Sequence, residues 1–237
     1  MRNITAIYSR ELKSYFSSPM AYIFLVIFSV INGYFFTNTF FLINQSDMRS
    51  LFSVIPLVFL FFIPAVTMGL IARERNSGTM EVISTLPVQD IELVVGKYMA
   101  ALTLIAVALA FTFVHFITLL NVGTNVDFGA AICGYIGLLL LGAFYGAIGT
   151  FSSSLTDNQV VAFIISIAFV LIFFMMDKVL IFVPAGITGV IQFLSVDFHL
   201  SNISRGVIDS RNLIYFGSMI WMFLILTVRI LEIRKWS

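Results

Sequence analysis

The chain has 237 residues, of which 60% are hydrophobic and only 11% are charged, and its formal net charge is +1. A water-soluble domain of this size needs far more polar surface than this composition supplies. The near-neutral charge excludes the basic surface typical of nucleic-acid-binding proteins. The single cysteine, Cys133, excludes an internal disulfide framework and a cysteine-based zinc cluster. The composition therefore indicates an integral membrane protein, which we expect to form one domain, 1–237.

The first expected element is an amphipathic helix at residues 1–18. Its apolar side chains recur at helical spacing, at Ile4, Ile7, Tyr8, Leu12, Tyr15 and Phe16. The charged residues Arg2, Arg10, Glu11 and Lys13 occupy other positions around the same helix. A helix this short and this charged cannot cross a bilayer, so we expect it to lie along the inner membrane interface.

Six apolar blocks follow, and each is long enough to cross a bilayer as a helix. They cover about 21–41, 51–72, 98–120, 132–151, 160–176 and 213–231. They lack the alternation of polar and apolar residues that marks the strands of a membrane barrel. Helices also satisfy every backbone amide within lipid. The sequence therefore predicts an all-α membrane protein with six spans, whose termini lie on the same side.

The basic residues indicate which side that is. One compartment receives nine of them: Arg2, Arg10, Lys13, Arg73, Arg75, Lys97, Arg229, Arg234 and Lys235. The other receives four: Arg49, Lys178, Arg205 and Arg211. Because Lys and Arg accumulate in cytoplasmic loops, the first group is predicted to be cytoplasmic. We expect a multi-pass protein of the cell inner membrane with both termini in the cytoplasm.

The segment 73–97, between the second and third spans, is the most distinctive polar part of the chain. Gly78 permits a sharp turn, Thr79–Leu86 has the length of two helical turns, and Pro87 ends them. Asp90 is expected to cap the third span. A bare connection needs roughly 2–8 residues, whereas this one has 25. We interpret it as a short helix that lies across a helical hairpin and faces a partner; the alternative is an ordinary polar loop.

Three other patterns carry expectations. Gly142, Gly146 and Gly149 form a stripe on the fourth span, which suits close helix packing; we favour packing within one subunit over a subunit interface. Residues 156–159, TDNQ, resemble a capping box for the fifth span, begun by Thr156. The segment 177–212 is interrupted by proline and glycine, so we expect short helices that lie on the outer face or re-enter the membrane.

Several catalytic motifs are absent from the sequence. The chain has no GxxxxGK[ST] phosphate-binding loop, because Gly96-Lys97 is followed by Tyr98, and it has neither HExxH nor GxSxG. We therefore expect no ATP binding by this chain and no catalysis. An intramembrane lipid-modifying enzyme would need clustered polar residues within the spans, and the predicted spans contain essentially no carboxylates.

Taken together, these features resemble an ABC-2 type transporter permease. That family has a loop pattern close to E-(R/K)-x-x-G-T-x-E-x-L-x-x-x-P. Residues 74–87, ERNSGTMEVISTLP, meet the pattern except that Ile83 stands in place of leucine. The segments 10–19, 62–68, 151–159 and 197–211 are also similar to the gliding-motility-associated, GldF-like branch of the family.

The resemblance implies a separate ABC-type ATPase, which would bind ATP and magnesium, while this chain binds no cofactor. It also implies a second permease subunit, either another copy or a GldG-like partner, in contact with membrane lipid and not with nucleic acid. The residues implied to couple to the ATPase are Glu11, Glu74, Arg75, Gly78, Thr79, Glu81, Thr85 and Pro87. The expected function is ATP-driven export or force transmission. The alternatives are a non-transporting membrane anchor of an envelope or gliding machine and, less favoured, a lipid-modifying enzyme.

Overall fold

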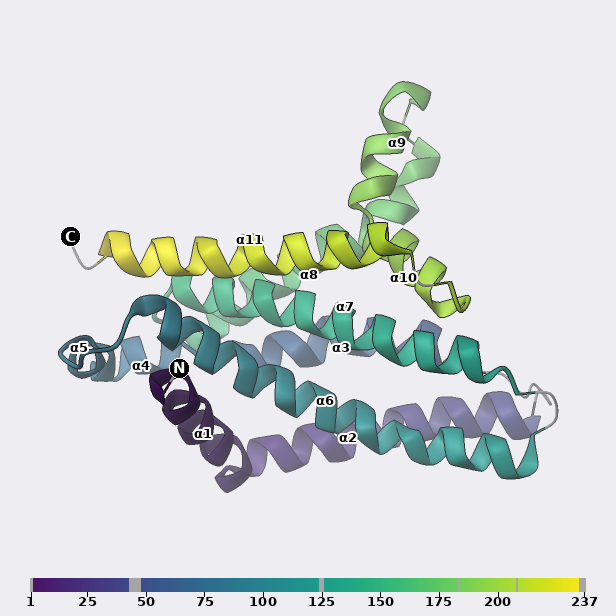
Figure 1. Ribbon diagram of the computed structural model, residues 1–237, viewed down its shortest axis with the longest axis horizontal. Helices are drawn as coiled ribbons and strands as arrows, with labels where there is room; N and C mark the ends of the chain where they lie inside the picture. The colour runs from purple at the N-terminus through teal and green to yellow at the C-terminus, as the bar shows by residue number, and fades with distance from the viewer. Residues whose placement is uncertain (1, 43–47, 124–125, 183, 208, 235–237) are drawn as a thin grey trace.

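The computed structural model describes residues 2–42, 48–123, 126–182, 184–207 and 209–234 (Figure 1). Within these ranges the regular structure is helical, and six helices are long and apolar enough to cross a membrane. They are Pro19–Phe41, Leu51–Asn76, Asp90–Val122, Phe128–Leu155, Gln159–Val179 and Ser210–Arg234. The prediction of an all-α protein with six spans is confirmed. Lys235, one of the nine basic residues counted above, lies outside the described residues.

The helices follow one another in a simple order. The first half contains α1 (Arg2–Ser17), α2 (Pro19–Thr37), the π-helical turn η1 (Asn38–Leu42), α3 (Arg49–Thr67), α4 (Ala72–Asn76), α5 (Thr79–Ser84) and α6 (Asp90–Val122). The second half contains α7 (Phe128–Leu155), α8 (Gln159–Val179), the 3-10 turn η2 (Leu180–Phe182), α9 (Ala185–Leu194), α10 (Val196–Ser204) and α11 (Ser210–Arg234).

The two ends of the bundle differ in character (Figure 1). At one end, here called the α5 end, lie α1, α4, α5 and the C-terminal part of α11. The opposite end, here called the α10 end, carries α10 and the first turns of α3 and α7. Near it, α9 projects sideways from the body of the bundle. The segment 177–212 thus contains short helices, as expected.

Two helix starts differ from the sequence expectation. The helix of the third span begins at residue 90, before the apolar block that starts at about residue 98, and Gln89 and Glu92 form a capping box that stabilises its first turn. Gln89, and not Asp90, is therefore its N-cap. For α8, the expected capping box begun by Thr156 is wrong. Asn158 is the N-cap, and its side chain accepts hydrogen bonds from the backbone amides of Val160 and Val161.

Helix α7 is the central helix of the bundle and packs against α3, α6, α8, α10 and α11. Its small residues let neighbours approach closely. A Cβ atom on Gly149 would lie 1.9 Å from Thr67 Oγ1, and one on Gly142 would lie 2.8 Å from Ile105 Cγ2. At Gly146 the nearest atoms are at ordinary contact distance, 3.6 Å or more. The three glycines therefore lie inside the subunit, and two of them sit at positions where no larger residue fits.

Candidate functional site

The segment that joins α3 to α5 is anchored by a serine of α7. The second span is interrupted after Thr67, and α4 begins at Ala72. At this break, Ser153 Oγ accepts hydrogen bonds from the backbone amides of Ile71 and Ala72, each at 3.0 Å, and donates one to the carbonyl oxygen of Met68 at 2.8 Å. Backbone groups left free by a helix break need such partners. Helix α7 therefore fixes where α4 starts.

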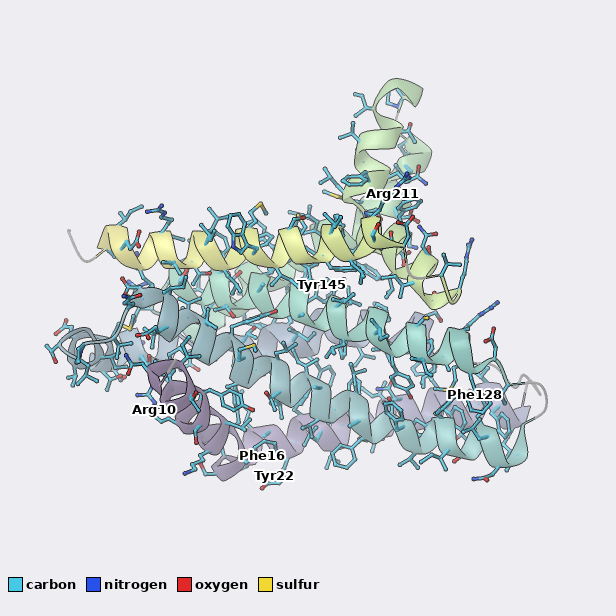
Figure 2. All side chains as sticks on the ribbon, in the orientation of Figure 1. Arg10, Phe16, Tyr22, Phe128, Tyr145 and Arg211 are labelled. Carbon is cyan, nitrogen blue, oxygen red and sulfur yellow. The ribbon has the colours of Figure 1, made fainter. Side chains whose placement is uncertain are left out.

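On one side of α4, Glu74 belongs to a compact group of four charged residues, which we call the Lys97 cluster. It consists of Arg10 and Glu11 from α1, Glu74 from α4 and Lys97 from α6. Lys97 Nζ lies 2.9 Å from Glu11 Oε1 and 2.9 Å from Glu74 Oε1. Arg10 Nη2 reaches the same two oxygens at 2.8 and 2.6 Å. Arg10 is labelled beside α1 in Figure 2. Two cations and two carboxylates thus join three helices.

Burial makes this cluster energetically important. The Lys97 side chain is 1% exposed, whereas Glu11 and Glu74 are 15% and 14% exposed. Burial by itself raises the pKa of Glu11, but the charges and hydrogen bonds of Lys97 and Arg10 outweigh it and hold that pKa below its usual value. The carboxylate is therefore ionised at neutral pH. A buried ammonium without its carboxylates would be strongly destabilising.

Helix α1 reaches the cluster because its packing on α6 is unusually close. A Cβ atom on Gly96 would lie 2.9 Å from Ile7 Cβ, so only glycine permits this approach. Farther along α1, the Tyr15 hydroxyl donates a hydrogen bond to the carbonyl oxygen of Val66 at 2.9 Å. The amphipathic helix α1 is therefore bound to both α6 and α3. Its Glu11, which pairs with Lys97, lies between these two contacts along the helix.

On the other side of α4, Arg75 belongs to a more exposed group of charged residues, which we call the Asp157 cluster. Its members are Arg75, Asp157 and Arg234. Arg75 Nη2 lies 2.7 Å from Asp157 Oδ1, and Arg75 Nη1 donates to the carbonyl oxygen of Ser154 at 2.9 Å. Arg234 donates to the carbonyl oxygen of Leu155 at 2.6 Å and lies 3.8 Å from Asp157. The side chain of Asp157 is 61% exposed. This cluster links α4 to the α7–α8 turn and to α11.

Helix α5 follows α4 after a left-handed glycine. Gly78 has φ +69°, and no heavy atom lies within 4 Å of a Cβ built there, so the backbone and not space requires glycine. Thr79 Oγ1 donates a hydrogen bond to the carbonyl oxygen of Glu74 at 3.1 Å, which ties α5 to α4. Beyond this turn, Val82 and Leu86 are 65% and 53% exposed. The segment therefore presents apolar side chains away from the bundle.

The remaining predicted site residues lie along the same exposed segment. Glu81 lines an open cleft of about 410 Å³ between α5 and α11, together with Arg75 and Arg234. The Thr85 hydroxyl donates to the carbonyl oxygen of Val82 at 2.8 Å and so helps to end α5. The Pro87 carbonyl oxygen accepts a hydrogen bond from Asn3 at 3.3 Å.

The structure divides the eight predicted coupling residues into two sets. Glu11, Glu74 and Arg75 are engaged with charges of the same chain, whereas the other five lie at residues 78–87. The sequence reasoning did not single out several residues on which this arrangement depends: Arg10, Lys97, Ser153, Asp157 and Arg234. One signal was available for Lys97, since a cation within the first turns of a membrane helix needs a carboxylate partner.

These features define a multi-pass helical membrane protein that carries two short helices, α4 and α5, at one end of its bundle. The family model described as ABC-2 family transporter protein matches residues 5–201, and the chain belongs to this family. No curated protein sequence matches the chain. Members of the family are the non-catalytic transmembrane component of an ABC transporter, and ATP hydrolysis resides in a separate subunit. The chain is therefore a transmembrane permease.

Proposed function

We propose that α5 is the coupling helix on which a separate ABC-type ATPase acts, and that α4 distributes the resulting motion through the permease. The ATPase would bind ATP and magnesium, and this chain would bind neither. One observation carries the proposal: α4 is held on both sides by charges, while Val82 of α5 and Leu86, two residues after α5, are exposed. A displaced α5 would therefore move α4, and with it α1 and α6.

The topology belongs to the same proposal. The sequence assigns nine basic residues to the side of the membrane on which α5 is expected and four to the other side. This distribution supports a cytoplasmic α5 end, both termini in the cytoplasm and a location in the inner membrane. A cysteine introduced at Ser77 would then be protected from an impermeant thiol reagent in intact cells, in a Cys133→Ala background. A cysteine at Asn121 would be labelled.

The transport path is proposed to lie between two permease subunits. Helix α7 fills the centre of the single bundle, and Gly142 and Gly149 are covered by Ile105 and Thr67. A dimer of six-span units, either two copies or this chain with a GldG-like subunit, would supply a path that the packed bundle does not. Membership of the GldF-like branch rests on the sequence similarity described above. Export and force transmission are both compatible with this arrangement.

The decisive experiment measures whether the exposed face of α5 retains an ATPase. The full chain is purified from native membranes in mild detergent, and the co-purifying ATPase subunit and its ATP hydrolysis are quantified. Val82→Ser and Leu86→Ser together are expected to lower ATPase retention by roughly tenfold, because an interface that covers these two exposed side chains gains affinity from the apolar area removed from water. Glu81→Ala and Gly78→Val are expected to impair coupling without lowering expression.

The matched control is Ile233→Ser, which removes an apolar side chain that is 68% exposed on α11. Retention should be unchanged in this variant. ATPase retention and activity equal to wild type in all variants of residues 78–86 would refute the assignment. ATP hydrolysis by the purified chain alone would also contradict it. Absence of any ATPase from the native complex would favour a non-transporting anchor.

A further inference from the structure

A second polar site lies at the junction of α9, α10 and the start of α11, where Figure 2 labels Arg211. It is a cavity of about 270 Å³. All three helices contribute to its lining, with Gln192 and Phe193 from α9, Asn202 from α10 and Asn212 from α11. None of its lining residues belongs to the Lys97 cluster or the Asp157 cluster, so coupling to an ATPase does not account for it.

The buried amide of Asn212 has one polar atom without a partner. The residue lines the cavity and is 3% exposed. His199 Nε2 donates to the carbonyl oxygen of Phe193 at 2.8 Å, and His199 Nδ1 lies 2.7 Å from Asn212 Oδ1. Asn212 Nδ2 then has no partner among the described residues. If the amide is turned around, its oxygen is left over instead, because only one end can face Nδ1. A buried polar group without a partner is costly, and a ligand in the cavity would supply the partner.

The rest of the polar lining has no net charge and can both donate and accept hydrogen bonds. Gln192 and Asn202 each present a side-chain amide, and neither amide has a partner in the described part of the chain. Each amide carries two N–H donors and one carbonyl acceptor. The two charged residues, Asp209 and Arg211, have opposite signs, so their charges cancel. The cavity therefore suits an uncharged ligand with several hydroxyl groups, since a hydroxyl group also donates and accepts.

The aromatic part of the lining favours a sugar among uncharged polar ligands. The rings of Phe193 and Phe198 both meet the His199 ring nearly at right angles, with ring centroids 5.4 and 5.3 Å apart. Phe193 is 54% exposed, so part of its ring is free to contact a ligand. A sugar ring carries C–H groups on its faces and hydroxyl groups at its rim, and the negative face of a phenyl ring attracts such C–H groups. The cavity is smaller than the roughly 300–1,000 Å³ of pockets for drug-sized ligands, which suits a single sugar unit.

We propose that this cavity binds one neutral sugar unit, with its ring against Phe193 and its hydroxyl groups on Gln192, Asn202 and Asn212. The unpartnered amide of Asn212 carries the proposal, because it shares the cavity with the two free amides and the phenyl rings. The proposal does not depend on coupling to an ATPase. Only the compartment from which the sugar comes, the outer side, rests on the proposed topology.

The test measures sugar binding to the purified full chain in phosphatidylcholine nanodiscs, which contain no sugar. Saturation-transfer NMR compares two soluble trisaccharides, maltotriose and triacetylchitotriose, with a capped tripeptide of alanine. We expect saturation transfer to at least one trisaccharide and none to the peptide, which offers similar hydrogen-bonding groups but no sugar ring. Gln192→Ala and Asn202→Ala should each weaken sugar binding roughly fivefold, because each removes a hydrogen-bonding partner. Phe193→Ala should weaken it by a similar factor, because the ring contacts are lost.

A second set of nanodiscs, which contains glucosyl diacylglycerol, identifies the source of the sugar. Loss of saturation transfer to the trisaccharide in these nanodiscs would show that a glycolipid headgroup occupies the site. Unchanged transfer would show that the site takes a soluble glycan. Both results support a sugar site.

The matched control is Asn121→Ala, which removes the same amide group outside the cavity. Asn121 Nδ2 donates to the carbonyl oxygen of Ile117 within α6. Sugar binding should be unchanged in this variant. Gln192→Ala and Asn202→Ala should keep the wild-type melting temperature, because neither amide has a partner in the described part of the chain.

Three outcomes would overturn the proposal. The first is no saturation transfer to either trisaccharide. The second is wild-type sugar binding in the double variant of Gln192→Ala and Asn202→Ala. The third is saturation transfer to the peptide alone, which would identify a peptide site in place of a sugar site.

Discussion

The two charge clusters that flank α4 use the same chemistry but differ in burial. In the Lys97 cluster the central ammonium is 1% exposed, whereas the central carboxylate of the Asp157 cluster is 61% exposed. Water can replace a lost partner of Asp157, but it cannot reach Lys97. Exposed ion pairs contribute little to stability, whereas breaking a buried pair is costly. We therefore expect α4 to move together with α1 and α6, and to shift more easily against α11.

The largest expected effect is that of Lys97→Met, which leaves the carboxylates of Glu11 and Glu74 with only Arg10 as a cationic partner. The free energy of unfolding should fall by roughly 3–5 kcal/mol. Thermal unfolding in detergent measures the loss, and hydrogen exchange of the α1 amides should rise most. The triple variant that adds Glu11→Gln and Glu74→Gln to Lys97→Met should regain part of the stability, because no carboxylate is then buried without its lysine partner. An unchanged melting temperature for Lys97→Met would show that the cluster does not join these helices.

An intermediate effect is expected from Ser153→Ala, which tests how α4 is held to α7. The substitution leaves the buried amides of Ile71 and Ala72 without their partner, at a cost of about 1–3 kcal/mol. Ser152→Ala is the matched control, because that buried serine donates only to Ile148 within its own helix. Its effect should be smaller. Equal losses in the two variants, measured as melting temperatures, would mean that Ser153 does not anchor the break between α3 and α4.

The smallest effect is expected from Asp157→Asn. Its exposed ion pairs with Arg75 and Arg234 should contribute about 0–1 kcal/mol to stability, and this contribution should decrease as salt is added. Melting temperatures at low and high ionic strength provide the measurement. A loss comparable to that of Lys97→Met would remove the distinction between the two clusters.

The sequence predicted much of the segment 73–97 because its signals are local. Gly78 was expected to make a turn, and it adopts φ +69°. A helix was expected at Thr79–Leu86, and α5 covers Thr79–Ser84. Asp90 was expected to cap the helix of the third span, but the N-cap is the preceding residue, Gln89, which is not one of the residue types that usually cap helices.

By itself, the sequence determined the fold class, the number of spans and the presence of a structured loop at one end. These properties follow from block hydropathy, helix period and turn residues, each of which acts over a few neighbouring positions. Only the tertiary structure decided that Lys97 joins Glu11 and Glu74, since Lys97 and Glu11 are 86 residues apart in the chain. That pairing depends on how α1 crosses α6 at Gly96, and no local pattern specifies the crossing. Burial, which makes this cluster strong and the Asp157 cluster weak, is likewise a property of the packed bundle.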